Sequence, residues 1–77
     1  MLSTRGAAAL LERRLRVYGA IPEARAVADL ARYTSSAENA RRAVSLSLVR
    51  GRIIRRGDLL LPAPDWRAEL HDATEAA

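Results

Sequence analysis

The stretch Thr34-Ser35-Ser36-Ala37-Glu38 carries the clearest helix-start signal in the sequence. Ser35 followed by Glu38 fits a capping box, in which the serine hydroxyl accepts a backbone amide and the glutamate bonds back to the cap residue. A helix is therefore predicted to begin at this point. The apolar pattern before it predicts another helix over about 22–32. The two helices are then joined by a tight turn.

The residues before this turn predict two helices. Ser3 and Thr4 are good N-cap types ahead of an alanine- and leucine-rich run, and Gly19 ends a helix of about 4–18. Pro22 suits the first position of the second helix, and the two residues before it are expected to form a short extended step. The apolar positions at helical spacing are Leu11, Leu15 and Tyr18 in the first helix, and Ala24, Val27, Ala28 and Ala31, with Leu30 beside them, in the second.

After the turn, the third helix is predicted to run to Gly51 and to be followed by a β-hairpin. Arg52-Ile53-Ile54-Arg55 and Asp58-Leu59-Leu60-Leu61 flank Arg56-Gly57, where the glycine supplies the positive φ of a hairpin turn. The apolar positions of the third helix are Ala40, Ala43, Val44 and Leu48, with Leu46 or Val49 on the flank.

The three helices are expected to share one core, because a domain this small must bury one face of every helix. The alanines of the second helix allow a neighbouring helix to approach closely. Ile53 or Ile54, with alternate leucines, should close the remaining side. The expected helical core residues are Leu11, Leu15, Val27, Leu30, Val44 and Leu48.

The predicted order of elements is that of a winged helix-turn-helix. Residues 8–62 resemble this DNA-binding domain family in the Ile21-Pro22 entry to the second helix and in the junction Gly51-Arg52-Ile53-Ile54 before the hairpin. Ser47 departs from the pattern, since many members have a leucine near this position, and Leu48 is expected to make that contact instead. The resemblance implies a mainly α fold, a three-helix winged helix-turn-helix with a small β-hairpin, over residues 1–64.

The distribution of charge suggests a polyanion-binding surface. The chain has 13 basic residues, all arginine, against 9 acidic residues, a net charge of +4. Residues 41–56 contain six arginines and no acidic residue, whereas residues 59–77 contain four acidic residues and one arginine, a net charge of −3. A basic middle followed by an acidic end suggests a polyanion-binding surface followed by an acidic tail. A solvated charged face is the alternative.

The resemblance implies that the third helix enters the major groove of double-stranded DNA and that the hairpin arginines meet phosphates or the minor groove. Arginine pairs well with guanine and asparagine with adenine. The expected function is that of a transcriptional regulator. The candidate DNA-binding residues are Ser36, Asn39, Arg41, Arg42 and Ser45 on the third helix, and Arg52, Arg55 and Arg56 on the hairpin. Alternatively, Arg42 only pairs with Glu38, or the domain is a winged-helix protein–protein interaction module within a larger assembly.

The composition argues against catalysis and metal binding. There is no cysteine, the one histidine (His71) lies among acidic residues, and the four glycines are too far apart for a phosphate-binding loop. We therefore expect no enzyme activity, metal, cofactor or small-molecule substrate. The longest apolar runs, 7–11 and 59–63, are far shorter than the roughly 20 residues of a membrane span. A cytoplasmic protein without a membrane partner is expected.

The end of the chain allows two interpretations. Residues 65–77 are expected to form an acidic C-terminal tail or a short docking helix. A homodimer is expected because the core of so small a domain is weak. Its contact residues would be Leu2, Trp66 and Leu70, which can alternatively pack on their own subunit.

Overall fold

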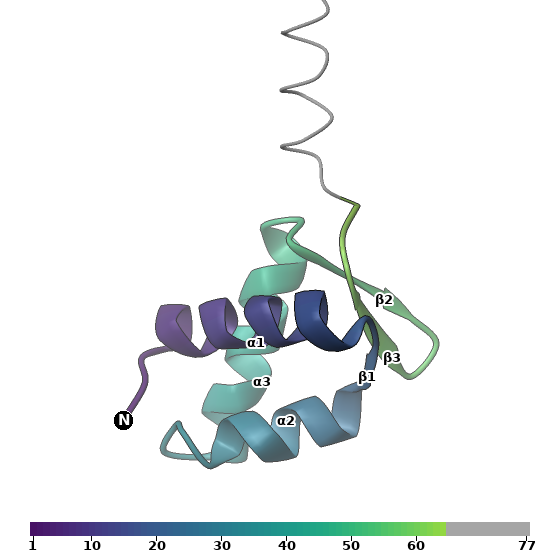
Figure 1. The fold of residues 1–77 in the computed structure, drawn as a ribbon. Coiled ribbons are helices and arrows are strands. Elements are labelled where there is room, and N and C mark those ends of the chain that lie inside the picture. The colour runs from purple at the N-terminus through teal and green to yellow at the C-terminus, as the bar shows by residue number, and fades with distance from the viewer. Residues whose placement is uncertain (65–77) are drawn as a thin grey trace, which may run out of the picture.

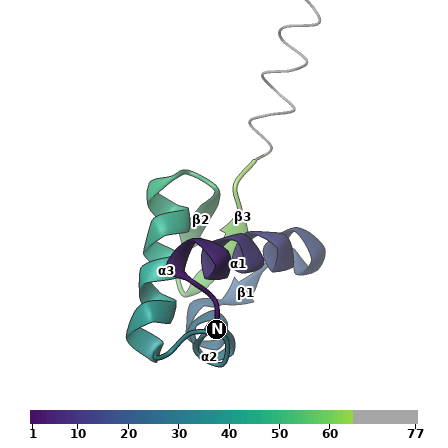
Figure 2. The same cartoon turned by 90° about the vertical axis from the view of Figure 1, so that its left-hand side faces the viewer.

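The computed structural model describes residues 1–64, which form a mainly helical, three-helix winged helix-turn-helix. Figure 1 shows α1 crossing α3, with α2 beneath and the sheet near the C-terminal end of α1, and Figure 2 shows the same crossing from the side. The expectations for the C-terminal tail, including Trp66, Leu70 and His71, lie outside the described residues. The elements are α1 (Thr4–Tyr18), β1 (Ile21–Pro22), α2 (Glu23–Ala31), α3 (Ala37–Val49), β2 (Ile53–Arg56) and β3 (Leu59–Pro62).

Helix α1 has the predicted bounds because both of its ends carry strong local signals. At the start, the Oγ atom of Ser3 accepts the amide of Gly6 at 3.1 Å. At the end, Gly19 has φ +87° and donates its amide to the carbonyl of Leu15 at 2.7 Å. A side chain is strained at this φ, so the glycine ends the helix.

The extended step predicted at residues 20–21 forms strand β1 one residue later, and the wing, the hairpin of β2 and β3, therefore belongs to a sheet of three strands. Strand β1 pairs antiparallel with β3, Ile21 opposite Leu60, and the strand order is β1-β3-β2. Pro22 caps α2 and is not its first residue. The backbone amide of Glu23 donates to the carbonyl of Asp58 at 2.8 Å. This bond joins the start of α2 to the turn of the wing.

The predicted cap of α3 at Ser35 is wrong by one residue. Ser36 has extended backbone angles, and its Oγ atom accepts the amide of Asn39 at 3.1 Å. The hydroxyl of Thr34, which is only 6% exposed, lies 3.1 Å from the carbonyl oxygen of Leu30 and 3.0 Å from that of Ser36. Because Thr34 is buried against the end of α2, the turn is held in a conformation in which Ser36, and not Ser35, is the N-cap of α3.

The hairpin turn is also shifted by one residue from the prediction. Arg56 pairs with Leu59, which leaves Gly57 and Asp58 as the two turn residues. Gly57 has φ +63°, and no non-glycine residue among residues 1–64 has positive φ. A two-residue turn in which only the first residue has positive φ fits the type II′ class, which matches the twist of antiparallel strands.

The core joins all three helices to the sheet, but its membership differs from the prediction. Leu11, Leu15, Leu30 and Val44 are buried as expected, whereas Val27 and Leu48 are only partly buried. On α2 the buried small residue is Ala26. The sheet contributes Ile53, which is 2% exposed, rather than Ile54. The buried apolar residues are Ala7, Ala8, Leu11, Leu15, Ile21, Ala26, Leu30, Ala40, Ala43, Val44, Ile53 and Leu60.

Ser47 is fully buried between α3 and α1. The expectation that Leu48 makes the core contact at this point of the helix is therefore wrong. The Oγ atom of Ser47 donates to the Oε2 atom of Glu12 at 2.7 Å and lies 3.5 Å from the carbonyl oxygen of Ala8. A hydroxyl is accommodated here because it has polar partners. Its small size, together with the alanines on both helices, lets α1 and α3 approach closely.

Replacement of Ser47 with leucine should lower the free energy of unfolding by about 1–3 kcal/mol, because the added carbons overpack a closed site. The same replacement at Ser45, on the exposed face of α3, should change it by less than about 0.5 kcal/mol. Urea denaturation of the two variants measures both effects. Equal losses at the two serines would contradict the packing described here.

Candidate nucleic-acid interface

The exposed face of α3 carries several of the predicted DNA-binding residues. Arg41, Arg42 and Ser45 are exposed and lie at helical spacing, opposite the buried Ala40, Ala43, Val44 and Ser47. Ser36 is exposed at the start of the helix, where its side chain serves as the cap. The structure therefore brings Arg41, Arg42 and Ser45 to one side of the helix, and together with Glu38 and the cap residue Ser36 we call this surface the α3 face (Ser36, Glu38, Arg41, Arg42 and Ser45).

Arg42 is held by two neighbours on its own helix. Its Nη2 atom lies 3.1 Å from the Oε1 atom of Glu38, and its Nη1 atom donates to the Oδ1 atom of Asn39 at 3.3 Å. The side chains of Arg42 and Glu38 are 64% and 72% exposed, respectively. An ion pair this exposed contributes little to stability. The Arg42 guanidinium can therefore exchange Glu38 for another anion at low cost.

Asn39 is half-buried at the start of α3. Its side-chain amide donates to the Oγ atom of Ser35, and its carbonyl oxygen accepts from Arg42. The NH2 group and the carbonyl oxygen of the Asn39 side chain thus each have a partner within the protein. A contact from Asn39 to a base requires these bonds to be exchanged.

Arg41 has a different environment. It forms no ion pair with a carboxylate of residues 1–64 and lines a shallow groove of about 480 Å³ with Glu23, Val27 and Asp58. The groove lies between the start of α2, the α3 face and the wing turn. Two carboxylates, those of Glu23 and Asp58, therefore line the same groove as Arg41.

The wing arginines have three different environments. Arg55 forms a bidentate ion pair with Glu23, its Nε and Nη2 atoms lying 2.6 and 3.0 Å from the carboxylate oxygens. The hydrogen bond and the charge of Glu23 raise the pKa of Arg55 above its ordinary value. Arg56 is exposed and forms no ion pair within the described residues, and Arg52 is half-buried at the base of the wing.

The ion pair between Glu23 and Arg55 was not anticipated from the sequence. From the sequence, Glu23 is simply an acidic residue in the first turn of α2, where it complements the helix dipole. No local spacing links two residues 32 positions apart. The pair forms because β1 places the start of α2 against the sheet.

Comparisons with protein-family models, curated proteins and solved structures found no match to this chain. Within residues 1–64, no helix is long and apolar enough to cross a membrane. The same residues contain no group of three or more metal-ligating side chains.

Proposed function

We propose that this chain binds double-stranded DNA and acts as a transcriptional regulator. The α3 face would lie in the major groove and the wing arginines along the phosphate backbone. The observation that carries the proposal is the position of Arg41, Arg42 and Arg56, which are exposed on α3 and on the wing next to it.

The environment of each arginine indicates which part of the DNA it would contact. Arg41, without an ion-pair partner in the described residues, is the best candidate for a base contact, where a bidentate pair with guanine discriminates by about 1–3 kcal/mol. Arg56, exposed beside the wing turn, would contact a phosphate. Arg42 and Arg55 must exchange a carboxylate for DNA, so their contribution is reduced by the strength of the ion pairs that they leave.

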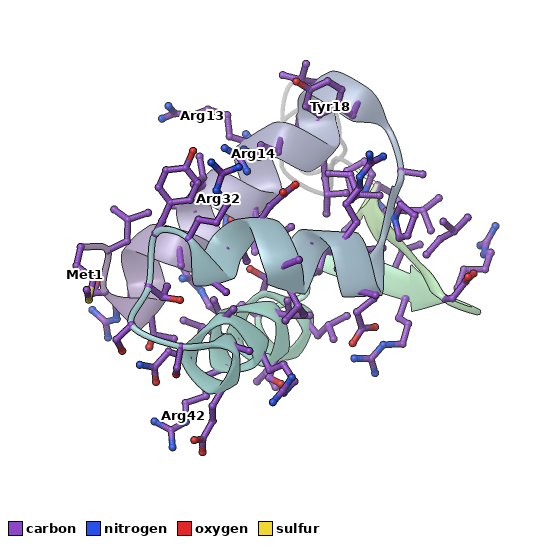
Figure 3. All side chains as sticks on the ribbon, turned by 90° about the horizontal axis from the view of Figure 1, so that it is seen from below. Met1, Arg13, Arg14, Tyr18, Arg32 and Arg42 are labelled. Atoms are coloured by element: carbon purple, nitrogen blue, oxygen red, sulfur yellow. The ribbon has the colours of Figure 1, made fainter. Side chains whose placement is uncertain are left out.

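Arg56→Gln should weaken binding to a random-sequence duplex and reduce the slope of log affinity against log salt by about one, as the loss of one phosphate contact requires. Arg13→Gln is the matched control, since it removes the same charge from an exposed position on α1, on the side of the molecule opposite Arg42 (Figure 3). Fluorescence anisotropy at several salt concentrations measures both slopes. Absence of salt-dependent binding, or equal slopes for both variants, would refute the proposed surface.

Glu23→Gln should tighten DNA binding several-fold at low salt, because it removes a carboxylate from the interface and releases Arg55 for a phosphate. The same replacement in an Arg55→Gln background should have a much smaller effect. Anisotropy titrations of the two single variants and the double variant form the test. Unchanged affinity for Glu23→Gln would mean that Arg55 only attaches the wing to α2.

A further inference from the structure

A second basic surface lies away from the α3 face. A half-open cleft of about 610 Å³ is formed by the C-terminal half of α1, by β1 and by α2. Figure 3 shows Arg14, Tyr18 and Arg32, which line it, on the side of the molecule opposite Arg42. Its volume lies within the range of about 300–1,000 Å³ that is usual for small-molecule sites.

The cleft carries an uncompensated positive charge. Arg14, Arg25 and Arg32 line it, against the single carboxylate of Asp29. None of the three arginines forms an ion pair within the described residues, where the two ion pairs lie on α3 and between α2 and the wing. Three guanidinium groups around one concavity attract an anion.

One of these arginines is already held in position. The guanidinium carbon of Arg14 lies 5.2 Å from the centroid of the Tyr33 ring, and its Nη2 atom donates to the Tyr33 hydroxyl at 3.3 Å. The backbone of Tyr33 is fixed in turn by bonds with Leu2 and Leu30. A guanidinium has five N–H donors. Stacking on the tyrosine therefore restrains Arg14 while leaving donors for a ligand.

The cleft also offers surface for a flat ring. The tyrosines that line it are well exposed, Tyr18 at 71% and Tyr33 at 42%, and Ile21 and Pro22 contribute apolar surface. Exposed aromatic rings beside arginines are suited to stacking on a planar group whose substituent is anionic. An anion alone would leave this apolar and aromatic part of the cleft unused.

We propose that the cleft binds a small planar anion, an aromatic ring bearing a phosphate or a carboxylate. Arg14, Arg25 and Arg32 would contact the anionic group, and Tyr18 would pack on the ring. The site shares no residue with the α3 face or the wing. The proposal therefore does not depend on DNA binding, and a bound ligand leaves the α3 face accessible.

The test is an NMR titration of the ¹⁵N-labelled full chain with adenosine 5′-monophosphate and, separately, with benzoate. At least one of them should produce saturable shifts at the amides of Tyr18, Arg25 and Arg32. Adenosine has the ring but no anionic group, and inorganic phosphate has the anionic group but no ring. Each should therefore bind at least about tenfold more weakly than the ring-bearing anion that binds. Arg32→Gln should raise the Kd of the ligand that binds by about tenfold, and Tyr18→Ala should also raise it.

The control is again Arg13→Gln, which neighbours Arg14 in sequence but does not line the cleft. It should leave the Kd nearly unchanged. Three results would overturn the proposal: no saturable shift with either probe, inorganic phosphate binding as tightly as the ring-bearing probes, or equal weakening by Arg13→Gln and Arg32→Gln. Arg32 and Tyr18 are both exposed, so neither replacement removes a core contact.

Discussion

The close contact between α1 and α3 determines which face of α3 is exposed. Two alanines on α1 (Ala7 and Ala8), two on α3 (Ala40 and Ala43) and Ser47 are fully buried, so much of the buried surface of these two helices is made of small side chains. The bond between Ser47 and Glu12 satisfies the polar group that this packing buries. With that face of α3 buried, Arg41, Arg42 and Ser45 can only point outward. The proposed DNA-binding surface depends on this arrangement.

The position of the wing depends on a second set of bonds, at the start of α2. The amide of Glu23 binds the carbonyl of Asp58 in the wing turn, and its carboxylate binds Arg55 on β2. Strand β1 adds its pairing with β3. These contacts hold the wing against the body, but they also bring Glu23 and Asp58 to the surface proposed for DNA. Under the proposed function, Arg55 either holds the wing to α2 through Glu23 or binds a DNA phosphate.

The sequence predicted those parts of the fold that local chemistry specifies. The bounds of α1 follow from Ser3 and Gly19, and the exposed side of α3 follows from helical spacing. The cap of α3 was misplaced because two adjacent serines are equally good caps, and the burial of Thr34 decides between them. On α2, Leu30 is buried as predicted, but Ala26 was missed in favour of Ala24 and Ala28, because the alanines are alike in hydropathy. The extended step before Pro22 was predicted, but its pairing with β3 was missed, because two residues show no periodicity.

Features built from distant segments could not be predicted in this way. The pair of Glu23 with Arg55 and the cleft around Arg14 and Arg32 each join residues from separate elements, and no spacing in the sequence connects them. The exposed residues of α3 were predictable because they lie on one helix. Their salt-bridge partners were predictable only within that helix, as for Arg42 and Glu38.

The most direct test of the proposed function is to map the DNA contact surface by NMR. Addition of a short duplex to the ¹⁵N-labelled chain should shift the amides of Arg41, Ser45 and Gly57, on α3 and the wing turn, and leave that of Arg13 on α1 nearly unchanged. Salt should reverse these shifts, because phosphate contacts contribute much of the affinity. Shifts confined to α1 and the cleft, or no shifts at low salt, would contradict the proposal that the α3 face binds DNA.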